Sequence, residues 1–157
     1  MKNLTKFLVS IFFVGYIKFA PGTWGTLVSL LLMYILFNIL SLPLIILTII
    51  FIFIFFIANY LINYFSLITN SHDSKHIVID ELLGIFIIFL FYDLIFFFND
   101  ILTYLIIFVL FRFFDIFKIF PSNFFDKYFK NGYGVILDDI IAGLYTVLTL
   151  IILNAFI

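Results

Sequence analysis

The chain contains no cysteine, which excludes disulfide bonds, thiolate metal sites and a cysteine nucleophile. Charge is also scarce: only 11% of the 157 residues are charged, and the formal net charge is -1. With a single arginine and no basic excess, the sequence lacks the electrostatic footprint of a nucleic-acid-binding protein. No repeat, low-complexity linker or run of charge marks a boundary, so we expect residues 1–157 to form one domain.

The residues that are present are overwhelmingly apolar. Hydrophobic residues make up 66% of the chain, 26 residues are Phe, and the mean hydropathy is +1.34. Water-soluble domains are nearer half apolar and a quarter charged. The composition therefore predicts an integral membrane protein, and its length allows about five helical spans in one compact bundle.

Long apolar runs separated by polar breaks predict where these spans lie. We expect an all-α, polytopic transmembrane bundle with a short N-terminal interfacial or re-entrant helix over 7–17, a run too short to cross a bilayer. The predicted spans cover residues 26–40, 44–67, 77–98, 101–114 and 135–157.

The positions of the cations predict the orientation of these spans. If the five spans alternate in direction, all eight Lys and Arg side chains fall on one side of the membrane. The positive-inside rule makes that side cytoplasmic, with the N-terminus inside and the C-terminus outside. The cations are Lys2, Lys6, Lys18, Lys75, Arg112, Lys118, Lys127 and Lys130.

Two pairs of adjacent acids lie about one turn inside predicted spans. Asp80 and Glu81 follow the start of the third span, and Asp138 and Asp139 follow the start of the fifth. A carboxylate inside a span costs roughly 2.5–3.5 kcal/mol on insertion scales, so two pairs at matched depth indicate function rather than packing. Such a cluster either binds a hard divalent cation through oxygen ligands or relays protons.

Small residues accompany both acid pairs. Gly84 follows Asp80 by four residues, and Ala142 and Gly143 follow Asp139. Small faces allow transmembrane helices to approach closely, so we expect the two acid pairs to be brought together.

Two further segments carry groups suited to phosphate. Gly22, Thr23, Gly25 and Thr26 belong to a backbone-rich turn before the first span, where N–H groups and hydroxyls can meet an anion, although a purely structural loop is the simpler interpretation of that turn alone. Arg112, Asp115 and Lys118 recur at three-residue spacing, which places cations beside a carboxylate on roughly one helical face.

Four segments, taken together and in order, resemble the phosphatidylglycerophosphatase A family of bacterial inner-membrane lipid phosphatases. Each segment alone is only moderately specific, but the set extends from residue 20 to residue 145. Two positions depart from the family pattern, because Ser74 follows Asp73 and Ile119 follows Lys118 where the family has proline. The segments are Ala20–Thr26, Ile77–Glu81 with Gly84, Phe111–Lys118, and Gly132–Asp139 with Ala142–Tyr145.

The resemblance implies Mg²⁺-dependent hydrolysis of phosphatidylglycerophosphate to phosphatidylglycerol and inorganic phosphate, at a site facing the cytoplasm. On this hypothesis the acid pairs hold one or two Mg²⁺ ions, and water or a carboxylate is the nucleophile. The metal ligands would be Asp80, Glu81, Asp138 and Asp139, which with Asp115 form the catalytic set. The phosphate ligands would be Arg112, Lys118, Gly22, Thr23, Gly25 and Thr26.

One alternative belongs to a different class of protein. The acids could form a cation site in a small ion- or proton-coupled membrane protein. A conducting path should cross the bilayer, yet every paired acid lies on one predicted side and only Asp93 lies farther across. The sequence therefore favours the phosphatase.

Overall fold

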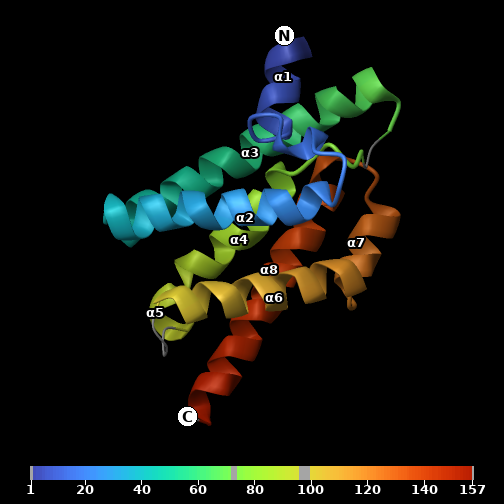
Figure 1. Cartoon of the computed structure of the whole chain (residues 1–157). Coiled ribbons are helices and arrows are strands. Elements are labelled where there is room, and N and C mark those ends of the chain that lie inside the picture. The colour runs from blue at the N-terminus through green and yellow to red at the C-terminus, as the bar shows by residue number, and fades with distance from the viewer. Residues whose placement is uncertain (1, 72–73, 96–99, 157) are drawn as a thin grey trace.

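The computed structural model describes residues 2–71, 74–95 and 100–156, and within these ranges every regular element is a helix (Figure 1). The all-α prediction is confirmed. The elements are α1 (Lys2–Val9), η1 (Val14–Tyr16), α2 (Pro21–Tyr34), η2 (Ile35–Ile39), α3 (Leu44–Thr69), α4 (Ile79–Leu90), α5 (Tyr92–Ile95), α6 (Asp100–Phe117), α7 (Ser122–Tyr128) and α8 (Gly132–Ala155).

Three of the helical stretches are long and apolar enough to cross a membrane by length and composition. They are Pro21–Ile39, where α2 continues into the π-helical η2, together with α3 and α8. They correspond to the predicted spans 26–40, 44–67 and 135–157. The first starts five residues earlier than predicted because Pro21 opens α2, a position where its missing N–H costs nothing.

The two remaining predicted spans are helical but differ in length. In the segment 77–98, α4 ends at Leu90 and the short α5 follows, while residues 96–98 lie outside the described part of the chain. The segment 101–114 lies within α6, whose 18 residues include Asp100, Arg112 and Asp115. Helix α4 has only 12 residues, and α6 carries three charged residues, so neither is among the three long apolar helices.

The short helix α4 forms the centre of the bundle. Ten of its twelve residues are buried, and it contacts α8, α2 and α3. Small residues permit the contact with α8, because a Cβ atom added to Gly143 would clash with the carbonyl oxygen of Gly84. A Cβ atom on Gly84 would in turn meet the Asp139 carbonyl oxygen and the Phe111 ring. The close approach expected from Gly84 and Gly143 is confirmed.

The N-terminal segment is not the single helix expected over 7–17. Helix α1 ends at Val9, and residues 11–13 adopt positive φ angles before η1 begins. The segment packs on the loop before α4: the Val78 N–H donates to the Val9 carbonyl oxygen (3.1 Å), and His76 Nδ1 lies 2.9 Å from the Gly15 carbonyl oxygen. These contacts tie the start of α4 to the N-terminal segment.

Candidate functional site

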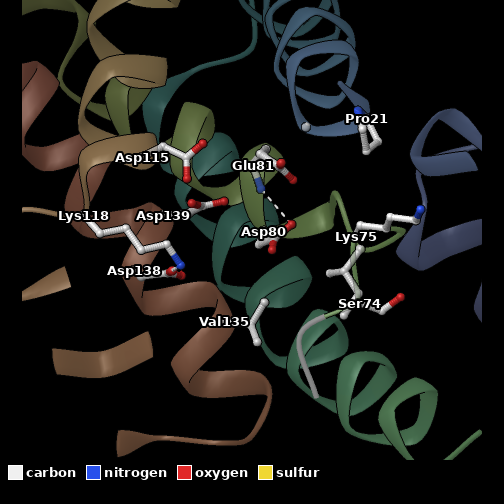
Figure 2. Close-up of a pocket in the computed structure, with 12 residues that line it drawn as sticks. Pro21, Ser74, Lys75, Asp80, Glu81, Asp115, Lys118, Val135, Asp138 and Asp139 are labelled. Carbon is white, nitrogen blue, oxygen red and sulfur yellow. Dashed lines mark hydrogen bonds and ion pairs between the residues drawn. The ribbon is translucent and has the colours of Figure 1, made fainter. Parts of the chain in front are cut away.

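Four helices converge on a cavity of about 210 Å³ (Figure 2). The first turns of α2 and α4, the second turn of α8 and the end of α6 all reach it. The cavity is lined by Pro21, Gly22, Ser74, Lys75, Ile77, Asp80, Glu81, Asp115, Lys118, Val135, Asp138 and Asp139. The sequence-predicted acids are thus gathered in one place.

Three carboxylates form a tight cluster in this cavity. Asp80, Glu81 and Asp139 are buried, and each offers an oxygen within 4.8 Å of the others. Glu81 Oε2 is buried without a hydrogen-bond partner among the described residues, while Asp80 Oδ1 accepts from the Glu81 N–H (3.1 Å). Carboxylates this close repel one another unless a cation or protons intervene. Oxygen-only donors and an unsatisfied carboxylate oxygen fit a hard divalent cation.

The arginine of α6 joins this cluster to a fourth acid. Arg112 Nη1 donates to Asp115 Oδ2 at 2.5 Å and lies 3.8 Å from Glu81 Oε1. Gly22, at the start of α2, packs against both groups, since a Cβ atom there would meet Glu81 Oε1 and the Arg112 guanidinium. Arg112 therefore holds positive charge beside the acids at the point where α2, α4 and α6 meet.

Asp138 occupies a different part of the cavity from its neighbour Asp139. Lys118 follows the last residue of α6 with a left-handed φ of 41°, and its Nζ donates to Asp138 Oδ2 at 2.7 Å. Successive residues of an α-helix point about 100° apart, and here Asp139 joins the acids of α4 while Asp138 points to Lys118. Three of the four predicted metal ligands thus converge, whereas Asp138 is paired with a cation.

The turn before α2 is only partly in the cavity. Pro21 and Gly22 line it, whereas Thr23, Gly25 and Thr26 are outside its lining. The Thr26 hydroxyl donates to the Gly22 carbonyl oxygen (2.9 Å), and a Cβ atom on Gly25 would meet the Val78 side chain. Gly25 thus has a packing role, and anion binding by Thr23, Gly25 and Thr26 stays a prediction.

A pair of asparagines in α3 is a feature that the sequence interpretation missed. Asn63 Oδ1 accepts from the Gly132 N–H (2.8 Å), and Asn63 Nδ2 donates to Asn59 Oδ1 (3.1 Å). Asn131 caps the same helix end by accepting from the Gly134 N–H. The pair therefore fixes the start of α8, the helix that carries Asp139. Its signal was two amides spaced i, i+4 in an otherwise apolar span.

Lys75 is a second residue that sequence reasoning did not assign to the site. It lines the cavity on the loop before α4, and its side chain extends away from the acids towards Pro21 (Figure 2). It is exposed, and among the described residues it has no ion-pair partner. The cavity thus has a cation at its rim in addition to Arg112 and Lys118.

Comparison with known proteins decides the family. The family model described as phosphatidylglycerophosphatase A matches residues 7–154, which include every residue of the cavity. The chain belongs to the phosphatidylglycerophosphatase A family. The phosphatidylglycerophosphatase A of Haemophilus influenzae is 34% identical over 134 residues, covering 85% of this chain and 78% of the relative.

Two further relatives show the range of names. The phosphatidylglycerophosphatase A of Escherichia coli is 29% identical, covering 91% of this chain and 79% of its own length. A Bacteroides thetaiotaomicron protein provisionally named a phosphatidylinositol-3-phosphatase is 31% identical, covering 84% and 82%. No solved structure matches the chain. The comparisons give no support to an ion-coupled membrane protein.

Proposed function

We propose that this phosphatidylglycerophosphatase A family member hydrolyses phosphatidylglycerophosphate. Water attacks the terminal phosphate, the bond to the glycerol oxygen breaks, and that oxygen takes a proton to give phosphatidylglycerol and inorganic phosphate. The observation that carries the proposal is the buried cluster of Asp80, Glu81 and Asp139 beside Arg112. The identity of the substrate is inferred from the two relatives that are named phosphatidylglycerophosphatase A.

A divalent cation, which we propose is Mg²⁺, fits the cluster of carboxylate oxygens. Asp80, Glu81 and Asp139 would hold the cation. Glu81 Oε2 is the ligand oxygen that otherwise lacks a hydrogen-bond partner among the described residues. When bound, Mg²⁺ neutralises charge on the phosphate oxygens and makes a coordinated water more acidic. Asp138 belongs to the surrounding charges rather than to the cluster, since Lys118 already pairs with it.

The neighbouring side chains provide the remaining chemistry. Arg112 and Lys118 are the cations for the phosphate oxygens, and the acids Asp115 and Asp138 hold them in place at 2.5 and 2.7 Å. Asp115 also lines the cavity, where it is positioned to accept a proton from the attacking water or to orient Arg112. Lys75 at the rim adds positive charge for an anionic headgroup.

We also propose the cellular setting. Residues 1–157 act as a single integral-membrane phosphatase domain in the bacterial inner membrane, with the cavity facing the cytoplasm. The distribution of cations along the chain supports this orientation through the positive-inside rule. In this arrangement the acyl chains of the substrate stay in the bilayer while its headgroup meets the acids near the interface.

The proposal is tested by phosphate release from phosphatidylglycerophosphate with the purified protein in detergent. We expect release with Mg²⁺, loss of release with EDTA, and recovery when Mg²⁺ exceeds the chelator; EDTA already saturated with Mg²⁺ is the matched control. Phosphatidylinositol 3-phosphate in a parallel reaction tests the substrate named for the third relative. Well-folded protein that releases no phosphate from phosphatidylglycerophosphate under any condition would overturn the proposal.

A further inference from the structure

A second hollow lies between α2 and α6. Its volume is about 440 Å³, and almost all of its surface is apolar. The two helices contact each other and run side by side in opposite directions, so that the start of α2 lies near the end of α6 (Figure 1). The groove is lined by Leu27, Leu30, Tyr34, Ile101, Tyr104, Leu105 and Phe108.

Both walls of this α2–α6 groove lead towards the polar site, although the groove and the polar cavity share no lining residue. On α2, Thr23 precedes Leu27, Leu30 and Tyr34 at helical spacing and therefore shares their face. On α6, Arg112 follows Phe108 by one turn on the face that also carries Leu105. The two polar ends meet, because a Cβ atom on Gly22 would lie 3.1 Å from Arg112 Nη1. The apolar walls therefore lead to a guanidinium that also contacts Glu81.

The groove and the step from it to Arg112 together match one half of a bilayer. From Ile101, at the far end of the groove, to Arg112 the rise along α6 is about 16 Å. The hydrocarbon core of a bilayer is about 30 Å thick, so a single leaflet provides about half of that length. At the far end the ring centroids of Tyr34 and Tyr104 lie 5.9 Å apart in an edge-to-face contact. These two rings close the end of the groove that is farthest from Arg112.

We propose that the α2–α6 groove binds one acyl chain of the phospholipid substrate and that the lipid reaches the acids laterally, between these two helices. The inference rests on the proposed function and adds to it the part of the protein that recognises the apolar half of the substrate. The acyl chain lies along Leu27, Leu30 and Leu105, and the phosphate group of the same lipid lies at Arg112.

Another apolar hollow in the described part of the chain does not have this connection. It has a volume of about 200 Å³ and lies among α1, α2, α3 and α4, where Leu8, Phe53 and Ile57 form part of its wall. Its α4 residues are Ile79 and Leu82, whereas Asp80 and Glu81 line the polar cavity. The body of α4 therefore separates this hollow from the acids, which makes it the matched control.

The first experiment compares chain lengths with a constant headgroup. Leu27→Trp fills the α2–α6 groove, and Leu8→Trp makes the same replacement in the control hollow; Leu27 and Leu8 are 41% and 36% exposed. We expect Leu27→Trp to raise KM for a dioleoyl substrate in mixed micelles about 10-fold and to change KM for the dihexanoyl substrate less than 2-fold. Leu8→Trp should change neither. Equal effects of Leu27→Trp on both substrates would overturn the proposal.

The second experiment measures binding without turnover. Trp24 is the only tryptophan, so Phe108→Trp and Phe53→Trp in a Trp24→Phe background place one reporter in each hollow. With EDTA present, we expect phosphatidylglycerophosphate with brominated chains to quench the reporter at 108 more than brominated phosphatidylcholine does. The reporter at 53 should not distinguish the two lipids.

The two experiments separate the groove from the reaction. The protein could show quenching at residue 108 that is specific to phosphatidylglycerophosphate and yet release no phosphate. This result would support the acyl-chain site and reject the proposed hydrolysis. Equal quenching by both lipids at residue 108 would show that the groove contacts only bulk lipid. That result would overturn the proposed acyl-chain site, whether or not the protein releases phosphate.

Discussion

The individual acids of the cavity differ in their surroundings, and this difference makes their roles testable. Asp80 and Asp139 lie in the three-carboxylate cluster, whereas Asp138 is paired with Lys118. Asp115 is paired with Arg112. Replacing an acid of the cluster removes a ligand oxygen from the proposed metal site. Replacing a paired acid instead leaves the side chain of Lys118 or Arg112 free to move.

We expect Asp80→Asn and Asp139→Asn each to reduce phosphate release at least about 100-fold, because loss of a residue that only orients a metal ligand already costs roughly 10- to 100-fold in metal affinity or activity. Both variants should still insert and fold, since the replacement is isosteric. Asp93→Asn is the matched control, because Asp93 is exposed on α5 and outside the cavity. Full activity in both cluster variants would contradict the metal-site assignment.

The sequence predicted the acids of the cavity and the placement of Arg112 beside Asp115, but not the pairing of Lys118 with Asp138. The matched depth of the two pairs follows from their positions in apolar runs, which sequence displays directly. Which acid of the Asp138–Asp139 pair faces α4 depends on the rotation of α8, and that is set by the contact between Gly84 and Gly143. The pairing of Lys118 with Asp138 depends on the left-handed turn after α6. Neither feature has a local sequence signal.

At the scale of the elements, α3 acts on the site without lining it. None of its residues is in the lining of the cavity, yet Asn63 accepts a hydrogen bond from the first residue of α8. The α8 segment between Gly132 and Asp139 is about two turns, so a shift at its start is carried to the acid cluster.

We expect Asn63→Leu to lower the thermal unfolding temperature in detergent by several degrees and to reduce kcat. The substitution leaves the Gly132 N–H without its acceptor, and an unsatisfied buried donor costs about 1–3 kcal/mol. Asn63→Asp keeps an acceptor oxygen and should restore most of both losses. Thr48→Val is the control, since the Thr48 hydroxyl donates only to the Leu44 carbonyl oxygen within α3. If Asn63→Leu changes neither the unfolding temperature nor kcat, α3 does not position the site through Asn63.

Element boundaries were predicted well where one physical signal decides them. Ser41 and Pro43 separate α2–η2 from α3, as the break after residue 40 indicated. The third predicted span is interrupted at Phe91, where α4 gives way to α5, a break that hydropathy does not reveal because the residues on both sides are apolar. The segment 7–17 was expected to be helical throughout, but Phe and Ile at 11–13 take positive φ angles that their residue types do not favour.

For the whole molecule, the sequence predicts the orientation in the membrane, and labelling from each side of the membrane can test it. A chain without cysteine accepts single cysteines as reporters. We expect Ser41→Cys, between η2 and α3, to react with an impermeant maleimide on intact spheroplasts. Lys127→Cys, on the exposed face of α7, should react only after permeabilisation. The reverse pattern would place the cavity on the outer side and contradict the proposed cytoplasmic site.

The buried position of α4 has a consequence for how the protein is made. Its principal partner is α8, which is synthesised more than 40 residues after α4, and two carboxylates of α4 lie beside Asp139 of that partner. Exposed to lipid alone, each acid would cost roughly 2.5–3.5 kcal/mol, so α4 cannot settle at its final depth before α8 is synthesised. Until then the insertion machinery has to shelter it. A chain that ends before residue 132 therefore lacks both the helix that covers the acids of α4 and one of the three clustered carboxylates, so we expect it to be inactive rather than partly active.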